Sequence, residues 1–144
     1  GLPPISDLIQ AGARLCVGVD SHACENAFEE VRAVELDERS RLESRHAVAE
    51  APVLLDAATR VGYAACGLET CHHEDRVTLK VDDPSMAGIN ESSGADAIVF
   101  NATPRSVDEV IVNGRSIVKN GVHEQYETTC QHYLGVLRKL GLMP

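Results

Sequence analysis

Hydrophobic and polar positions change their spacing midway along the chain, and this change predicts two kinds of structure. In the first half the apolar positions repeat mainly with a helical spacing, interrupted by one short apolar run. We predict a helix over residues 4–12, a strand over 14–19, and helices over 26–43 and 50–65, with Gly67 as a C-terminal stop. The positions expected to face inward on the two longer helices are Phe28, Val31, Val34, Leu36, Val53, Leu54, Ala57, Ala58 and Val61.

The second half reads as a small β unit closed by a helix. Alternating or apolar runs predict strands over 77–81 and 96–100, and a turn or helix start over 83–85 separates them. Asn113-Gly114 between two apolar runs predicts a hairpin, because both central residues of a type I′ turn need a positive φ, and Asn120-Gly121 predicts a second turn. The chain closes with a helix over 124–140. Its apolar face is formed by Tyr126, Cys130, Tyr133, Leu134 and Leu137.

Asp20 is the first candidate for chemistry. It ends the apolar run 14–19, and Ser21 and His22 follow it directly. A buried strand of a parallel barrel delivers catalytic groups in this way, at its C-terminal end. Two structural alternatives stay open: Asp20 could be a helix N-cap or a strand-end turn, and Ser21 could cap the next helix.

Length and charge narrow the classes of function. A complete (β/α)8 barrel needs roughly 250 residues, so the 144 residues cannot hold one, and we expect a piece of a longer chain that was cut before Gly1. The net charge of −9 argues against a nucleic-acid partner, and no apolar run is long enough to predict a membrane span. Five scattered cysteines favour reduced thiols and a cytoplasmic location.

Three segments resemble, in the correct order, the amidohydrolase superfamily of metal-dependent deaminases and hydrolases. Residues 17–21 resemble the family's last barrel strand, 54–67 the following helix, and 107–123 the strand-turn-strand that closes its β-sandwich. Within the superfamily, the chain resembles the formimidoylglutamate deiminases of histidine breakdown. The stretches that carry this narrower resemblance are 20–23, 28–39, 77–79 and 83–88.

The resemblance implies an α/β fold made of the C-terminal part of a (β/α)8 barrel and a portion of the flanking β-sandwich. Residues 1–67 would form the last barrel strand and helices, 68–123 the sandwich portion and 124–144 a C-terminal helix. The enzyme would be a zinc-dependent hydrolase that breaks a C–N bond of a small-molecule substrate. In the family, the residue matching Asp20 binds the metal and takes a proton from the metal-bound water, and Ser21 and His22 would line the same pocket.

The chain also departs from the family pattern. The His-x-His metal motif is absent, and the other metal ligands and the substrate residues would precede Gly1. The isolated chain is therefore expected to be inactive, because one carboxylate cannot hold zinc alone. Cys66, Cys71, His72 and His73 are zinc-ligand types, but their spacing is not that of a structural zinc site, and we expect a polar connecting loop.

An acidic run on the predicted helix 26–43 is assigned to a solvated face. Its carboxylates alternate with Arg32 and Arg39 at spacings that favour ion pairs along a helix; they are Glu29, Glu30, Glu35, Asp37 and Glu38.

Two hypotheses of different class remain. The first is the C-terminal part of a deiminase, with another deaminase or a chlorohydrolase of the superfamily as the runner-up. The second is a non-catalytic fragment that folds as a homo-oligomer or with an upstream segment of the same enzyme, because the predicted strand 14–19 would leave bare edges.

Overall fold

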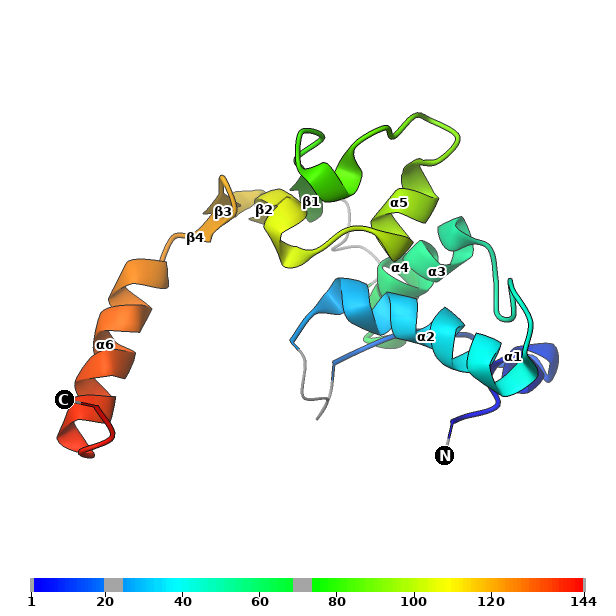
Figure 1. The fold of residues 1–144 in the computed structure, drawn as a ribbon, viewed down its shortest axis with the longest axis horizontal. Coiled ribbons are helices and arrows are strands. Elements are labelled where there is room, and N and C mark those ends of the chain that lie inside the picture. The colour runs from blue at the N-terminus through cyan, green and yellow to red at the C-terminus, as the bar shows by residue number, and fades with distance from the viewer. Residues whose placement is uncertain (1, 20–24, 69–73, 144) are drawn as a thin grey trace.

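A computed structural model describes residues 2–19, 25–68 and 74–143. Its first half is helical, with α1 (Ile5–Gln10), α2 (Ala27–Leu42), α3 (Ala51–Ala58) and α4 (Arg60–Ala65). The second half contains, in order, β1 (Arg76–Leu79), η2 (Pro84–Met86), α5 (Gly94–Phe100), η3 (Pro104–Ser106), β2 (Val107–Val112), β3 (Arg115–Lys119), β4 (Val122–His123) and α6 (Tyr126–Lys139). Figure 1 shows α1 to α5 gathered into one body, the strands beside it, and α6 standing away at the far end.

Local sequence signals explain where several helices begin and end. The predicted helices over 4–12 and 26–43 are confirmed as α1 and α2. Asn26 is the N-cap of α2, and its side chain accepts a hydrogen bond from the backbone N–H of Phe28 at 3.1 Å. Gly67 has φ +71°, and the N–H of Leu68 donates to the carbonyl of Tyr63, so the predicted stop at Gly67 is confirmed.

The predicted helix over 50–65 is wrong in one respect, because it is broken at Thr59. This residue has φ −126° and ψ −96°, outside the helical region, and separates α3 from α4. Its hydroxyl donates to the carbonyl of Leu55 at 2.8 Å. A hydroxyl that bonds back to the preceding turn competes with the helical ladder, which periodicity alone does not reveal.

The strand predicted over 14–19 does not form in the described chain. The segment is irregular, although its exposure still alternates, and Leu15 and Val17 pack against the helical core. A parallel barrel strand is defined by hydrogen bonds to neighbouring strands, and the sheet of the described residues contains only β1 to β4. The segment therefore has the composition of a barrel strand without the partners that would make it one.

The strand predicted over 96–100 is also wrong, because these residues lie in α5. A short apolar run cannot distinguish a strand from a buried helix by its period. The polar turn before the run favours the helix. The Asn90 side chain accepts hydrogen bonds from the N–H groups of Ser92 and Ser93, and the helix begins at Gly94. Ala97 and Val99 are then buried.

Apart from the segment 96–100, the β unit forms where it was predicted. Strands β1, β2, β3 and β4 pair antiparallel in chain order. Asn113 and Gly114 have φ +50° and +73°, and Asn120 and Gly121 have +53° and +78°. Both Asn-Gly turns are therefore confirmed with the backbone signs that their sequence requires. The predicted turn or helix start over 83–85 becomes η2, which the Asp83 side chain caps through the N–H of Ser85.

The core consists of two buried clusters that meet at α5. One contains Val31, Ala51, Leu54 and Val99, and the other contains Met86, Ala97 and Ala102. Two residues expected inside are exposed, Leu36 at 42% and Val53 at 55%, because each lies on the outer side of its helix. The described chain is a mixed α/β arrangement, and within it no helix is long and apolar enough to cross a membrane.

Candidate functional site

Asp20, Ser21 and His22 lie outside the described residues. The structure describes the segments on either side of them, which end at Val19 and begin at Glu25, one residue before the N-cap of α2. Asn26 is that N-cap, and its side chain accepts a hydrogen bond from the backbone N–H of Phe28. The roles predicted for Asp20, Ser21 and His22 therefore stay predictions.

The first half of α2, which follows this segment, is held firmly in place. Arg32 donates from Nε to the carbonyl of Val99 at 3.1 Å and from Nη2 to that of Ala102 at 2.8 Å. Val99 lies in the last turn of α5 and Ala102 two residues after its end, where a cation is favoured by the helix dipole. Further along α2, the Arg39 guanidinium lies 5.1 Å from the centre of the Phe100 ring. The start of α2 is thus anchored to residues about 70 positions further along the chain.

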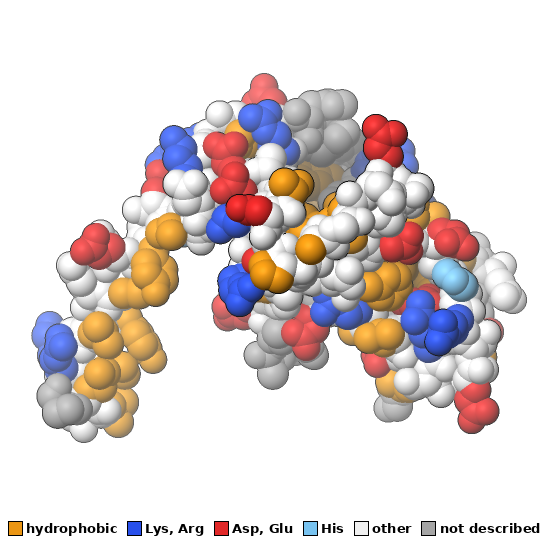
Figure 2. All heavy atoms as spheres, turned by 45° about the horizontal axis from the view of Figure 1, so that its top comes forward, with side chains coloured by type: hydrophobic (Ala, Val, Ile, Leu, Met, Phe, Trp, Pro, Cys, Tyr) orange, Lys and Arg blue, Asp and Glu red, His pale blue; other side chains and the backbone are white. Residues whose placement is uncertain are grey.

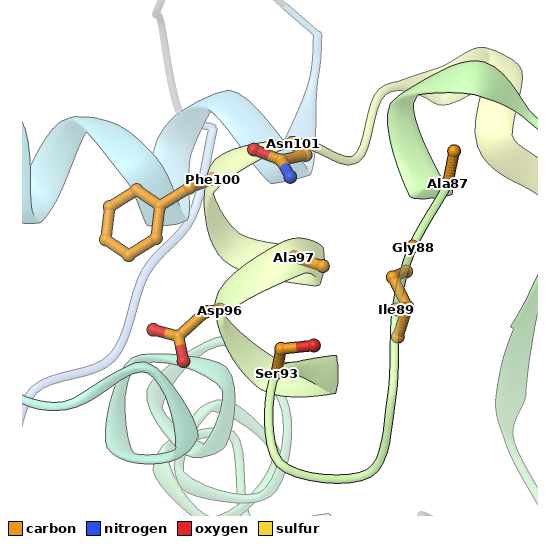
Figure 3. A pocket seen from close by; sticks show the side chains of 8 residues that line it. All are labelled: Ala87, Gly88, Ile89, Ser93, Asp96, Ala97, Phe100 and Asn101. Atoms are coloured by element: carbon orange, nitrogen blue, oxygen red, sulfur yellow. The ribbon is translucent and has the colours of Figure 1, made fainter.

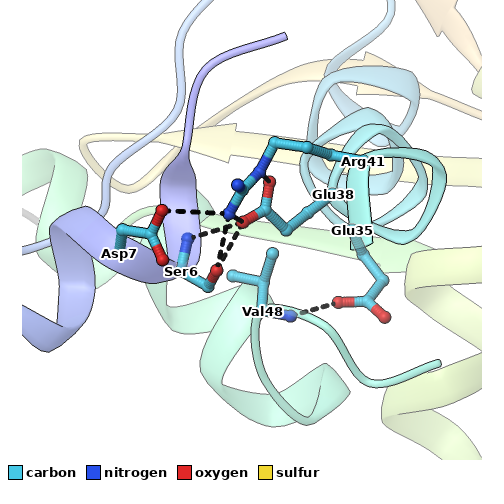
Figure 4. A network of polar contacts seen from close by, with 6 residues as sticks. All are labelled: Ser6, Asp7, Glu35, Glu38, Arg41 and Val48. Atoms are coloured by element: carbon cyan, nitrogen blue, oxygen red, sulfur yellow. Dashed lines mark hydrogen bonds and ion pairs between the residues drawn. The ribbon is translucent and has the colours of Figure 1, made fainter. Parts of the chain in front are cut away.

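The acidic run on α2 contradicts its assignment to a solvated face at two positions, Glu35 and Glu38, whose side chains are fully buried. Glu38 accepts hydrogen bonds from the N–H and hydroxyl of Ser6, and Arg41 donates to both of its oxygens at 2.6 and 2.8 Å (Figure 4). Arg41 also reaches Asp7 at 3.2 Å. The hydrogen bonds from Arg41 and Ser6 outweigh burial and lower the pKa of Glu38 to about 2.

Glu35 secures the loop after α2 in the same manner. Its carboxylate accepts from Arg39 Nε at 2.7 Å and from the backbone N–H groups of Ala47 and Val48 at 3.0 and 2.9 Å. Burial alone would raise the pKa of Glu35, but the hydrogen bonds from Arg39, Val48 and Ala47 lower it overall. Both carboxylates are ionised and already occupied by protein donors. They join α1, α2 and the 43–50 loop, and they are not placed for acid–base chemistry.

These two carboxylates were missed by sequence reasoning because their partners are distant in the chain. Ser6 lies 32 residues before Glu38, and Val48 lies 13 residues after Glu35. One signal was available: Glu35 and Glu38 stand three apart, and Val31 lies four before Glu35, so all three share one side of the helix.

Residues that could hold a metal are not brought together in the part of the chain that the structure describes. Cys66 is exposed at the end of α4, whereas Cys71, His72 and His73 lie outside the described residues. Across 2–19, 25–68 and 74–143, no three or more His, Cys, Asp or Glu side chains are grouped as metal ligands. The described residues therefore do not form the zinc site that the resemblance implies.

A shallow hollow lies between α5 and the segment after η2 (Figure 3). Its volume is about 220 Å³, and its polar lining side chains are Ser93, Asp96 and Asn101. Asp96 points away from the opposite wall formed by residues 87–89, while Ser93 faces that wall. No nucleophile and base are paired there, so the hollow suggests no reaction.

Solved structures similar to this chain define its fold. An amidohydrolase from Brucella melitensis has a TM-score of 0.80 at 22% identity, covering 97% of this chain and 33% of that one. An adenosine deaminase from Xanthomonas campestris with bound zinc has a TM-score of 0.76 at 17% identity, covering 96% and 34%. A triazine hydrolase variant has a TM-score of 0.75 at 21% identity, covering 95% and 32%. The chain therefore has the fold of about one third of such an enzyme.

Sequence comparison identifies a more specific likeness. The chain is 30% identical over 151 aligned residues to the formimidoylglutamate deiminase of Pseudomonas aeruginosa. The match covers 97% of this chain and 33% of that protein, so the chain spans about a third of its relative's length. No protein-family model matches. The resemblance to amidohydrolases, and among them to formimidoylglutamate deiminase, is confirmed.

Proposed function

We propose that this chain is the C-terminal part of an amidohydrolase that deiminates N-formimidoyl-L-glutamate to N-formyl-L-glutamate and ammonia. The observation that carries the proposal is the match to a formimidoylglutamate deiminase along 97% of the chain. The fold shared with an amidohydrolase and a deaminase supports the broader class.

In the whole enzyme, residues 1–67 would form the last strand and helices of the barrel, 68–123 a portion of the β-sandwich and 124–144 a C-terminal helix. The segment 15–19 supports this division. Leu15, Val17 and Val19 are partly buried, whereas Cys16 and Gly18 between them are exposed. One side of the segment thus contacts helices, as a barrel strand contacts its outer ring, and the segment pairs with none of the strands β1 to β4.

Asp20 is proposed to carry the proton in the reaction. The oxygen of water adds to the formimino carbon, the bond from that carbon to the terminal nitrogen breaks, and ammonia leaves. The water proton must reach the departing nitrogen, and a carboxylate fixed beside both atoms can transfer it. Ser21 and His22 are proposed to line the same pocket and contact the substrate.

We propose zinc as the cofactor of the whole enzyme, with Asp20 as one ligand. The bound zinc of the adenosine deaminase neighbour supports this. The described residues group no three metal-ligand side chains, and we propose that the remaining ligands precede Gly1 in the whole enzyme. No step proposed here passes through the metal.

Two alternatives are separable by experiment. The adenosine deaminase and triazine hydrolase neighbours favour other superfamily reactions, with Asp20 in the same place but a different substrate. A non-catalytic fragment would have the fold without any turnover.

A chimera tests the proposal: the matching third of the Pseudomonas aeruginosa enzyme is replaced by this chain. We expect turnover of N-formimidoyl-L-glutamate, with release of ammonia, but no turnover of adenosine or a triazine. Asp20→Asn should lower kcat by about 1,000-fold. Asp37→Asn, exposed on α2, is the matched control and should leave the rate unchanged.

Two results would contradict the proposal. A folded chimera with full activity in the Asp20→Asn variant would remove Asp20 from the chemistry. A folded chimera that prefers adenosine or the triazine would replace the substrate assignment with the alternative.

A further inference from the structure

The last helix, α6, exposes an apolar face that the rest of the described chain does not cover. None of its 14 residues is buried, and Tyr126 and Tyr133 are both 62% exposed. The apolar side chains run along one side of the helix, which Figure 2 shows as a continuous orange band on the arm that projects from the body. A helix of about this length is marginal alone in water and normally depends on packing of its apolar face. The helix therefore needs a partner.

The spacing of this face specifies what kind of surface fits it. Tyr126, Cys130, Tyr133, Leu137 and Leu140 follow one another at intervals of four, three, four and three residues. This is the repeat of a helix that packs along its length against a second helix with the same repeat. We define these five residues as the seam.

Charge at the two ends of α6 decides between two orientations. Glu127 lies in its first turn, and Arg138 and Lys139 lie in its last turn. In an antiparallel pair, Glu127 approaches Arg138 of the partner subunit at each end, whereas a parallel pair places like charges together. The chain carries a net charge of −9, but residues 124–140 contain two acidic and two basic side chains, so two copies of this helix meet without a net charge on either.

We propose that α6 is a dimerisation surface that pairs antiparallel with α6 of a second copy of this chain. The interface is isologous, since each seam meets the same seam. When the two seams run antiparallel, Tyr126 lies against the partner's Leu137 and Cys130 lies against the partner's Tyr133. Cys130 does not meet its own counterpart. This proposal is independent of the proposed enzymatic reaction.

Sedimentation equilibrium of the 144-residue chain, from roughly 1 to 100 micromolar, tests the association. We expect a mass approaching twice 15.5 kDa as the concentration rises. Tyr133→Glu should weaken dimerisation by at least about 100-fold, because it places a charge in the centre of the seam. Gln131→Glu adds the same charge on the opposite side of the helix and should change it less than about 3-fold. Circular dichroism of both variants checks that the fold is retained, and Leu137→Ala gives a second, milder seam variant.

A monomer at the highest concentration would overturn the proposal. A dimer that Tyr133→Glu leaves intact would also overturn it, because another surface, such as the 14–19 segment, would then hold the two copies together.

The orientation of the two helices is tested by mixing two single-cysteine chains under a glutathione redox buffer. One chain retains only Cys130, and the other carries Tyr133→Cys with all native cysteines replaced by serine. The antiparallel seam predicts the mixed disulfide. A disulfide between two copies of Cys130 would overturn the orientation.

Discussion

Two helices of similar length, α2 and α6, reverse the usual relation between polarity and burial. Helix α2 has a strongly charged sequence, yet Glu35 and Glu38 on it are fully buried. Helix α6 has a clear apolar face, yet no residue on it is buried. The apolar pattern of a helix thus shows which face requires a partner, whereas the structure shows whether this stretch of chain supplies one.

The difference follows from what each helix can reach. Around α2 the chain supplies α1, the 43–50 loop and α5, which together provide apolar contacts and the donors that its carboxylates need. A buried carboxylate is tolerated only when it is paired and hydrogen-bonded, and both of these are. Beyond β4 the described chain offers α6 nothing comparable (Figure 1).

Replacing a leucine by alanine should change stability most differently between the core against α2 and the exposed face of α6. Leu54→Ala removes a side chain that is 1% exposed in the core against α2 and should lower the free energy of unfolding by about 3 kcal/mol. Leu140→Ala, at a position 66% exposed on the seam, should cost less than about 1 kcal/mol in dilute solution. Urea denaturation at low protein concentration measures both. Equal losses would show that α6 is packed within a single chain.

Removing a buried carboxylate from α2 should have the next largest effect. Glu35→Ala leaves the N–H groups of Ala47 and Val48 without their acceptor and should lower the free energy of unfolding by about 2–3 kcal/mol. Asp37→Ala, two residues along on the exposed side, is the control and should stay within about 0.5 kcal/mol. The urea denaturation midpoints of the two variants measure this difference in stability. If they lose the same amount, the hydrogen bonds of Glu35 do not stabilise the fold.

Acid should weaken the α1–α2 junction through Glu38. Its pKa in the folded chain is about 2, below the usual value of 4.5, so the unfolded chain binds the proton more tightly. The stability that Glu38 contributes is therefore fully present above about pH 4.5 and is lost as the pH falls toward 2. Urea midpoints measured across this range should fall less steeply in Glu38→Gln than in the unaltered chain. Identical slopes would assign the acid sensitivity to other carboxylates.

These contrasts also explain which parts of the fold could be predicted from sequence. The hairpin was predictable because Asn113 and Gly114 satisfy a purely local backbone requirement. The segment 14–19 was misjudged because pairing, and not composition, makes a strand, and no strand of the described chain lies beside it. The burial of Glu38 depends on Ser6, 32 residues away, a distance that periodicity does not span.

Only part of the candidate site around Asp20 could be predicted from the sequence. Asp20 was singled out by its position after an apolar run, and its role stays a prediction because it lies outside the described residues. The chain spans about a third of its relative's length, and its described residues group no three metal-ligand side chains, so the rest of the predicted site stays a prediction too.

The smallest expected effect concerns how far α6 depends on its partner. Gly135 lies on the side of α6 opposite the seam, and a Cβ added there would meet no atom within 4 Å. Gly135→Ala should therefore stabilise the helix by about 0.5–1 kcal/mol without touching the proposed interface. If α6 is marginal alone, circular dichroism should show a gain in helicity in dilute solution that fades at concentrations where the dimer forms. Gly121→Ala is the contrast, since Gly121 has φ +78° and its added Cβ would lie 3.0 Å from the carbonyl of Val107. It should destabilise the sheet at every concentration. A gain from Gly135→Ala that is the same at all concentrations would mean that α6 is equally helical with and without a partner.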